Sequence, residues 1–132
     1  MVWQEVTALV EKSVQMIFLR SIHIEIADAC NERCVHCYIP NERKNNAIDP
    51  ALFYRLIEEG RKMNIIHVTL SGGEPLLHKD ILGFLKRCRE LDLSVNVLSN
   101  LTLLTDDILS EMKKNTSSLC TSFPLFYGCH SA

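Results

Sequence analysis

Hydrophobic residues recur along the chain with two periods in turn, which predicts alternating strands and helices. Ile22, Ile24 and Ile26 alternate with polar residues, the period of a strand whose two faces differ. Two further apolar runs have strand length, at 65–70 and 93–98. Apolar residues at helical spacing predict helices over 50–63, 80–91 and 105–112, and a short amphipathic helix over 3–12. A weaker strand signal covers 117–123.

Capping residues support the predicted helix starts. Asp49 is a good N-cap and is followed by Pro50, which suits the first turn of a helix. Thr105 can cap a helix whose first turn holds Asp106 and Asp107, acids that suit the positive end of the helix dipole. Strict alternation of strand and helix predicts an α/β fold, a parallel sheet with right-handed crossovers and helices packed outside it.

Three strands end in loops that carry distinctive residues. The first runs into the segment from Cys30 to Tyr38, the second into Gly72-Gly73-Glu74-Pro75, and the third into Ser99-Asn100. Because the carboxyl ends of parallel strands lie at one edge of a sheet, where ligands bind in such folds, we expect these loops to converge.

The first of these loops has the composition of a metal site. Cys30, Cys34 and Cys37 are separated by three residues and then by two. One tight loop with three thiolates can hold a cubic iron-sulfur cluster and leave its fourth iron open, whereas a zinc ion usually takes four protein ligands. A zinc knot with His36 or His23 as the fourth ligand is the alternative.

The second loop can bring its backbone close to a ligand. Gly72 and Gly73 have no side chains and permit unusual backbone angles, and Pro75 fixes the exit of the turn. This suits the amino acid moiety of a ligand beside the metal. A plain turn between a strand and a helix is the alternative.

The two motifs together, with Tyr38 directly after the third cysteine, resemble the radical S-adenosylmethionine (radical SAM) superfamily. The resemblance runs from about Ser21 to Lys114 and implies a partial (β/α) TIM-like barrel, of which this chain would hold about three or four β/α units. It further implies a [4Fe-4S] cluster and S-adenosylmethionine as cofactors. In this family the reduced cluster cleaves S-adenosylmethionine to methionine and a 5′-deoxyadenosyl radical, which abstracts hydrogen from a substrate.

The resemblance assigns roles to residues of this chain. Cys30, Cys34 and Cys37 would ligate the cluster, and Tyr38 would lie near the adenine. The residues expected around the rest of the cofactor are Gly72, Gly73 and Glu74 near the methionine amine, and Ser99 and Asn100 near the ribose or carboxylate. The glycine that is familiar after the asparagine is replaced by Leu101. No catalytic residue is assigned.

Composition excludes several other classes of function. With 132 residues, 47% of them hydrophobic and 23% charged, the chain has the size and composition of one globular domain. A formal net charge of −2 gives no basic excess for nucleic acid. No apolar run approaches the roughly 20 residues that span a bilayer, and the first residues do not resemble a signal peptide. We therefore expect a cytoplasmic protein with reduced cysteines.

The pattern divides the chain into three parts. We expect a helical lead-in over 1–20, the core over 21–114 and an aberrant tail over 115–132, where the regular alternation of periods is lost. The expectation is a truncated or frame-shifted relative of a larger enzyme, whose incomplete barrel leaves a sheet edge exposed.

Three hypotheses of function follow from these observations. The first is a radical SAM enzyme, or a fragment of one, that works with an external one-electron reductant of the flavodoxin or ferredoxin type. Because such loops are common in enzymes that modify peptides or mature cofactors, a peptide is a candidate substrate. The second is a non-catalytic iron-sulfur or electron-transfer module, or an inactive fragment. The third is a zinc-stabilised interaction domain.

Overall fold

The computed structural model describes residues 19–34, 37–39, 46–114, 117–121 and 129–131. The helix expected over 3–12 and the alternative ligand His36 lie outside these residues. The elements follow one another along the chain as β1 (Ser21–Ala27), β2 (Glu32–Cys34), α2 (Pro50–Lys62), β3 (His67–Gly72), the 3-10 helix η2 (Pro75–Leu77), α3 (Ile81–Glu90), β4 (Ser94–Ser99), α4 (Asp106–Lys113), β5 (Ser117–Thr121) and β6 (Cys129–Ser131).

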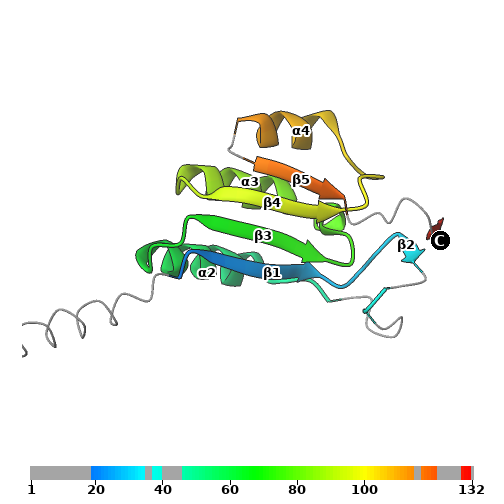
Figure 1. The fold of residues 1–132 in the computed structure, drawn as a ribbon, viewed down its shortest axis with the longest axis horizontal. Helices are drawn as coiled ribbons and strands as arrows, with labels where there is room; N and C mark the ends of the chain where they lie inside the picture. Colours follow the sequence, from blue (N-terminus) through cyan, green and yellow to red (C-terminus); the bar gives the residue numbers. More distant parts are fainter. Residues whose placement is uncertain (1–18, 35–36, 40–45, 115–116, 122–128, 132) are drawn as a thin grey trace, which may run out of the picture.

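Four strands form a parallel sheet in the order β1-β3-β4-β5 (Figure 1). The register places Ile22 beside Val68, and Val68 beside Val95. This confirms the predicted α/β fold of a partial (β/α) barrel, including its fourth strand. The sheet follows chain order, and β1 and β5 are its outer strands.

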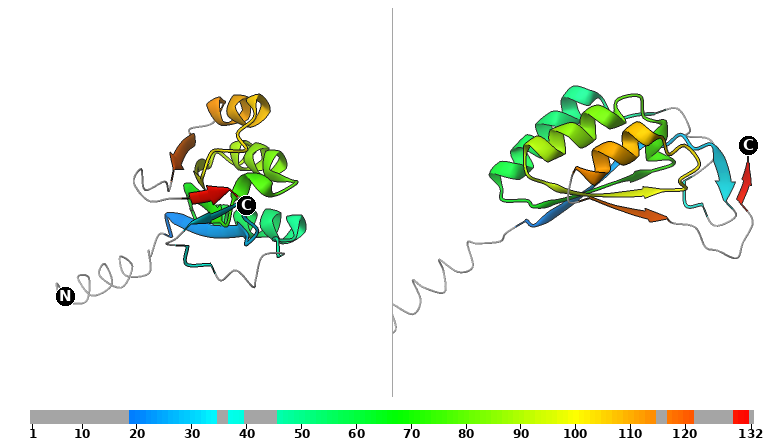
Figure 2. Two further views of the ribbon diagram at one scale, coloured as in Figure 1. Left: turned by 90° about the vertical axis from the view of Figure 1, so that its right-hand side faces the viewer. Right: turned by 90° about the horizontal axis from the view of Figure 1, so that it is seen from above.

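A second, two-stranded sheet was not expected from the sequence. β2 pairs with β6 in antiparallel register, with Cys34 opposite Cys129. It lies beyond the carboxyl ends of the parallel strands (Figures 1 and 2). The segment around Cys34 therefore takes part in a strand as well as in the cysteine loop.

Helices α2, α3 and α4 cover one face of the parallel sheet (Figure 2). The core lies between the two layers, where alternate strand residues meet the apolar sides of the helices. Phe53 of α2 stacks on Phe84 of α3 with 3.9 Å between ring centroids. The fully buried members of this core include Ile26, Phe53, Ile57, Val68, Leu70, Phe84, Leu85, Val95 and Val97.

The predicted caps at the first and third of these helices are confirmed. The Asp49 side chain accepts a hydrogen bond from the Ala51 amide at 2.7 Å, and Pro50 is the first residue of α2. The Thr105 hydroxyl accepts from the Ile108 amide at 3.3 Å at the start of α4. Each helix therefore begins where local side-chain chemistry satisfies an amide that has no partner within the helix.

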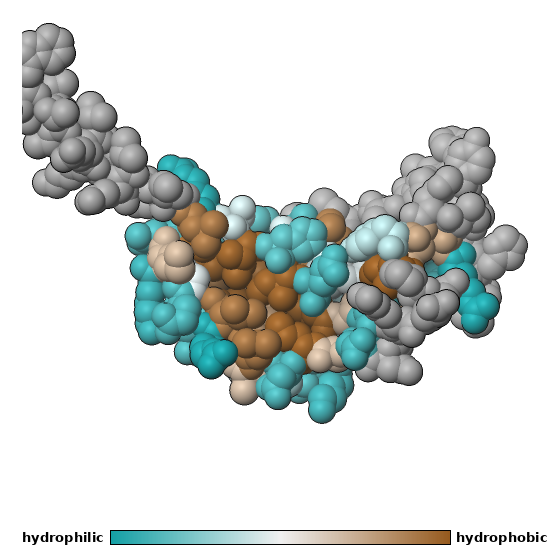
Figure 3. All heavy atoms as spheres, turned by 90° about the horizontal axis from the view of Figure 1, so that it is seen from below, coloured by the Kyte–Doolittle hydropathy of each residue, from teal (hydrophilic) through white to brown (hydrophobic). Residues whose placement is uncertain are grey.

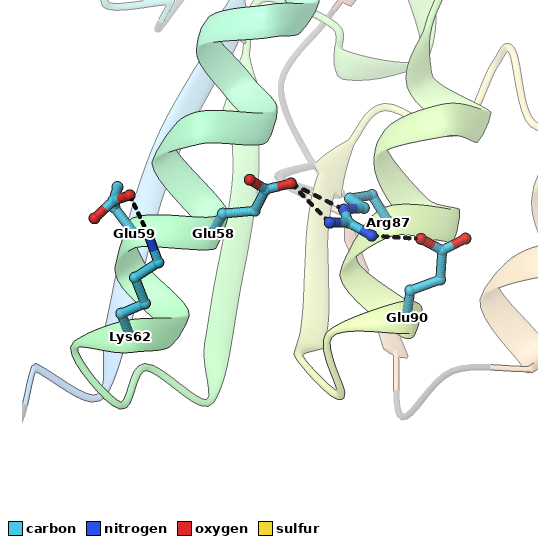
Figure 4. A network of polar contacts seen from close by, with 5 residues as sticks. All are labelled: Glu58, Glu59, Lys62, Arg87 and Glu90. Atoms are coloured by element: carbon cyan, nitrogen blue, oxygen red, sulfur yellow. Dashed lines mark hydrogen bonds and ion pairs between the residues drawn. The ribbon is translucent and has the colours of Figure 1, made fainter.

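On the solvent side, Arg87 joins α2 to α3 (Figure 4). Its guanidinium donates to Glu58 of α2 at 2.7 Å and to Glu90 of its own helix at 2.8 Å. Exposed ion pairs contribute little to stability, typically below about 1 kcal/mol. The position of the helices is therefore set mainly by the apolar layer beneath them.

The side of the molecule formed by β1 and α2 has an exposed apolar area (Figure 3). Leu52 and Leu56 of α2 and Ile66, which precedes β3, are among the exposed large hydrophobic residues.

The face of the parallel sheet that the helices do not cover carries polar residues. The strand positions that alternate with the core residues include His23, Thr69 and Asn96. No helix among the described residues is long and apolar enough to cross a membrane.

Replacing Phe53 by alanine tests this core. Phe53 is fully buried, whereas the neighbouring Leu52 is 39% exposed. We expect Phe53→Ala to lower the free energy of unfolding by about 3–5 kcal/mol, because it leaves a cavity beside Phe84. Leu52→Ala is the matched control and should cost less than about 1 kcal/mol. Urea unfolding followed by circular dichroism measures both, and equal losses would contradict the assigned packing.

Candidate functional site

The three loops that the sequence singled out meet at the carboxyl ends of β1, β3 and β4. Direct hydrogen bonds join the loop after β3 to the loop after β1, and both of them to the loop after β4. The convergence that parallel topology predicted is therefore observed, and each loop is held by the other two.

The glycine loop packs directly against the backbone that leads into the cysteines. The Gly73 amide donates to the Ala27 carbonyl at 2.8 Å, and the Glu74 amide donates to the Ala29 carbonyl at 2.8 Å. A Cβ atom on residue 72 or 73 would overlap these carbonyl groups. Gly72 also has a φ of +132°, a backbone conformation that favours glycine. Both glycines are needed for this close contact.

Glu74 joins the glycine loop to the end of β4. Its carboxylate is fully buried and accepts from the Ser99 hydroxyl at 2.7 Å, the Asn100 amide at 2.8 Å and the Leu76 amide at 3.0 Å. A buried carboxylate requires such donors, because burial without hydrogen bonds is costly. The structure thus gives Glu74 and Ser99 a role in holding the loops together. Their predicted contacts with a cofactor stay predictions.

Asn100 reaches the cysteine loop. Its side-chain amide donates to the side-chain oxygen of Asn31 at 2.9 Å. Asn31 lies next to Cys30, so this bond links the end of β4 to the first cysteine of the motif. Sequence reasoning missed Asn31, although it lies within the motif itself, because nothing in a local pattern pairs two residues that are 69 positions apart.

The three cysteines do not form a finished metal site. Cys30 is half-buried and accepts a weak hydrogen bond from the Glu32 amide at 3.4 Å, while Cys37 is exposed. Cys34 is disulfide-bonded, in contrast to the reduced cysteines that we expected. Its sulfur must be reduced before it can ligate iron. Among the described residues, no three His, Cys, Asp or Glu side chains gather as a metal site.

A backbone hydrogen bond nevertheless joins the second and third cysteines. The Cys37 amide donates to the Cys34 carbonyl at 3.1 Å. Three soft thiols on one short, partly exposed loop are the donor set that iron-sulfur clusters take. The chemistry of the donors fits a cluster, and assembly requires reduction of Cys34 and movement of the side chains.

Glu32, between the first two cysteines, has an unsatisfied acceptor. The residue is only 9% exposed, and its Oε2 atom has no hydrogen-bond partner. Such an atom calls for a donor or a positive charge. The sequence alone gave no signal for it, because an acid in a polar loop is normally solvated.

Tyr38 follows the third cysteine and lies at the surface. Its side chain is 70% exposed, and its hydroxyl donates to Glu25 of β1 at 2.8 Å. Partial desolvation and the hydrogen bond to Glu25 raise the pKa of Tyr38 above its usual value. The exposed ring is available to a flat ligand, as the predicted contact with adenine requires.

Cys88 lies apart from this site, on the buried side of α3. It is fully buried, and burial raises the pKa of its thiol to about 12. The thiolate form that binds metals and reacts with electrophiles is therefore suppressed. Cys88 therefore acts as a small apolar residue of the core.

Leu101 has a backbone conformation that favours glycine, which is the residue familiar at this position in the superfamily that the motifs resemble. Its φ is +64°, in the left-handed region. In the described part of the chain, the other two non-glycine residues with positive φ are Asn64 and Asp92, residue types that tolerate this region. Leucine does so at a cost of about 1–2 kcal/mol. This position is therefore strained, within the loop that holds Asn100.

Comparison with known proteins gives a family match. Residues 24–123 match the family described as the Radical SAM superfamily. The chain is 31% identical over 78 residues to the PqqA peptide cyclase of Methylobacterium nodulans, an alignment that covers 58% of this chain and 21% of the cyclase. It is 29% identical over 89 residues to a probable GTP 3′,8-cyclase of Methanopyrus kandleri, covering 67% of this chain and 29% of that protein.

Solved structures share the fold. The crystal structure of Streptococcus suis SuiB bound to the precursor peptide SuiA superposes with a TM-score of 0.72 at 21% identity, covering 88% of this chain and 27% of that one. SuiB bound to S-adenosylmethionine gives the same TM-score at 22% identity, covering 88% of this chain and 28% of that one. The chain spans between a fifth and a third of the length of these relatives.

Replacing Gly73 by alanine tests the contact between the glycine loop and the cysteine loop. The added methyl group would overlap the backbone of Asp28 and Ala29, and we expect a loss of about 3 kcal/mol in the free energy of unfolding. Gly83→Ala in α3 is the control, because there the new methyl group meets only the Tyr54 hydroxyl at the far end of a flexible side chain. Similar stabilities for the two variants, measured by urea unfolding, would contradict the contact.

Two substitutions at Leu101 test the strained turn. Leu101→Val should lower the free energy of unfolding by more than about 1 kcal/mol, because a β-branched residue fits the left-handed region least well. Leu101→Asn should raise it by up to about 1 kcal/mol, since asparagine tolerates that region. Thermal and urea unfolding of the two variants beside the parent protein give the comparison. The assigned backbone angle is wrong if the valine variant is as stable as the asparagine variant.

Proposed function

The chain belongs to the Radical SAM superfamily, and we propose that its cysteine loop binds a [4Fe-4S] cluster whose open iron takes S-adenosylmethionine. The observation that carries the proposal is the junction of three loops, in which the backbone leading to the cysteines is locked onto the glycine motif. When bound, the reduced cluster supplies the electron that cleaves S-adenosylmethionine to methionine and the 5′-deoxyadenosyl radical, which abstracts hydrogen from a substrate.

Each part of the site has a task in this proposal. Cys30, Cys34 and Cys37 hold the cluster as thiolates, once Cys34 is reduced. Gly72 and Gly73 bring the backbone of the loop near the methionine amine, and that amine, as a hydrogen-bond donor, needs acceptors such as carbonyl oxygens.

The unsatisfied carboxylate oxygen of Glu32 supports a cationic ligand. S-adenosylmethionine carries a positive sulfonium and a positive ammonium group, and Glu32 offers a buried acceptor without a donor in the cysteine loop. A ligand with these charges would satisfy an atom that the described residues leave unpaired. Glu32 therefore belongs with the residues that favour this cofactor.

The polar contacts at the other loops suit the remaining parts of the cofactor. Asn100 is partly buried and Tyr38 is exposed at the same end of the sheet. We assign them to the ribose or carboxylate and to the adenine ring, respectively. Ser99 is already occupied by Glu74, and it would act by holding that carboxylate in place.

The residues of this chain do not identify a substrate or a partner, so both are proposed from similar proteins. The relative named PqqA peptide cyclase acts on a peptide, and SuiB, which shares the fold, is solved bound to a precursor peptide; both support a peptide as substrate. An external one-electron reductant of the flavodoxin or ferredoxin type would supply the electron. We place the protein in the cytoplasm, where reduced thiols persist.

Anaerobic reconstitution tests the proposal. With excess reductant present, we expect about four iron and four sulfide ions per chain, and dithionite with S-adenosylmethionine should yield 5′-deoxyadenosine. Cys30→Ala should lose the cluster. Cys88→Ala is the control, because it makes the same change in the core, and it should keep the iron content of the parent protein.

Three outcomes separate the hypotheses. A cluster that forms without producing 5′-deoxyadenosine favours an electron-transfer module or an inactive fragment. Tight zinc binding without cluster uptake favours a zinc-stabilised domain. Iron uptake by the Cys30→Ala protein equal to that of the parent contradicts the ligand assignment.

A further inference from the structure

Three side chains form a closed ring of hydrogen bonds between the cysteine loop and the loop after β4. The Asn100 amide nitrogen donates to the Asn31 oxygen at 2.9 Å. The Asn31 amide nitrogen donates to the Thr102 hydroxyl oxygen at 2.7 Å, and that hydroxyl donates to the Asn100 oxygen at 2.7 Å. Each member thus gives one hydrogen bond and accepts one within the ring.

The order of donors and acceptors around the ring allows only one orientation for each of the two side-chain amides. A hydroxyl can donate one bond, and each asparagine has a distinct donor and acceptor end. If any one amide turned over, two donors or two acceptors would face each other. The Thr102 amide adds a further bond to the Asn100 oxygen at 3.0 Å, which holds that oxygen in the accepting role. Bonds in such a cycle reinforce one another.

The ring is anchored to the glycine loop through the backbone of Asn100. The Asn100 amide donates to the buried Glu74 carboxylate at 2.8 Å. The chain of contacts therefore runs from Glu74 to Asn100, and from Asn100 to Asn31, which precedes Cys34 and follows Cys30. The anchored end is buried and the Thr102 end is exposed, so the ring ties the cysteine loop to a buried point of the glycine loop.

We propose that Asn31, Asn100 and Thr102 are positioning residues, which fix the place of the first cysteine relative to the glycine loop. This inference rests on the proposed function, because it concerns the distance between cluster and cofactor. Losing the ring would leave the thiols present but allow the loop to shift relative to the pocket of the methionine group.

A double-mutant cycle on the reconstituted protein tests the ring. We would compare the parent, Asn31→Ala, Asn100→Ala and the double variant. The readout is the affinity for S-adenosylmethionine, followed by the change it causes in the electron paramagnetic resonance signal of the reduced cluster. Asn31→Ala should weaken binding roughly fivefold to tenfold, the effect of one or two hydrogen bonds. The double variant should be no more than about twofold weaker than Asn100→Ala.

Two further variants keep the test independent of any failure to fold. Thr102→Val removes the hydroxyl that accepts from Asn31 and so interrupts the ring, but it leaves every residue of the cysteine loop unchanged, and it should weaken binding by a similar factor. Ser94→Ala is the matched control, because it removes side-chain hydrogen bonds to Ile66 and His67 at the opposite end of β4. It should leave both the affinity and the resonance signal unchanged.

The outcomes distinguish the two proposals. If the parent protein shows no change with S-adenosylmethionine, the proposed function fails and the positioning role fails with it. If the parent responds, and Asn31→Ala and Thr102→Val bind equally tightly with the same signal, the positioning role alone is overturned. Purely additive losses in the cycle would also overturn it, because they would mean that Asn100 acts without Asn31.

Discussion

The carbonyl groups of Ala27 and Ala29 leave no room for a side chain on the two residues that face them, and the rest of the site depends on this constraint. Because Gly72 and Gly73 lack a Cβ atom, the loop after β3 comes close enough to form two short backbone hydrogen bonds. These bonds set the height of the cysteine loop above the sheet. They also turn the next residue, Glu74, inward.

Because Glu74 points inward, the glycine motif also has a structural role. A carboxylate in a loop at the carboxyl end of a strand suggests a ligand contact, but the structure places it against Ser99, Asn100 and Leu76. The two glycines and Glu74 together therefore hold the loops in place, and the proposed ligand contacts fall to other residues, Glu32, Tyr38 and the cysteines. Removing the Glu74 carboxylate would destabilise both the glycine loop and the loop after β4, because the donors on Leu76, Ser99 and Asn100 would lose their acceptor.

The fold could be predicted further than the site, for reasons visible in particular residues. Periods of hydrophobicity and the caps Asp49 and Thr105 are local signals, and they located α2, α3, α4 and the four parallel strands to within about two residues. The pairing of β2 with β6 could not be predicted, because the short segment 32–34 has no alternation. In the site, the spacing of the cysteines suggested metal ligands. The parallel order of the strands predicted that the three loops lie close together. The bond between Asn31 and Asn100 and the left-handed Leu101 depend on tertiary context that no window of sequence contains.

The order of strands in the parallel sheet has a consequence for how the chain folds as it is made. β3 pairs with β1, β4 with β3 and β5 with β4, so each strand finds its partner already synthesised. During translation, a growing chain can therefore extend the sheet one unit at a time, from the amino-terminal edge. The cysteine loop leaves the ribosome early but acquires its ties to Glu74 and Asn100 only when β3 and β4 have been added. Iron that arrives before β4 has been made would therefore meet a loop that lacks these ties.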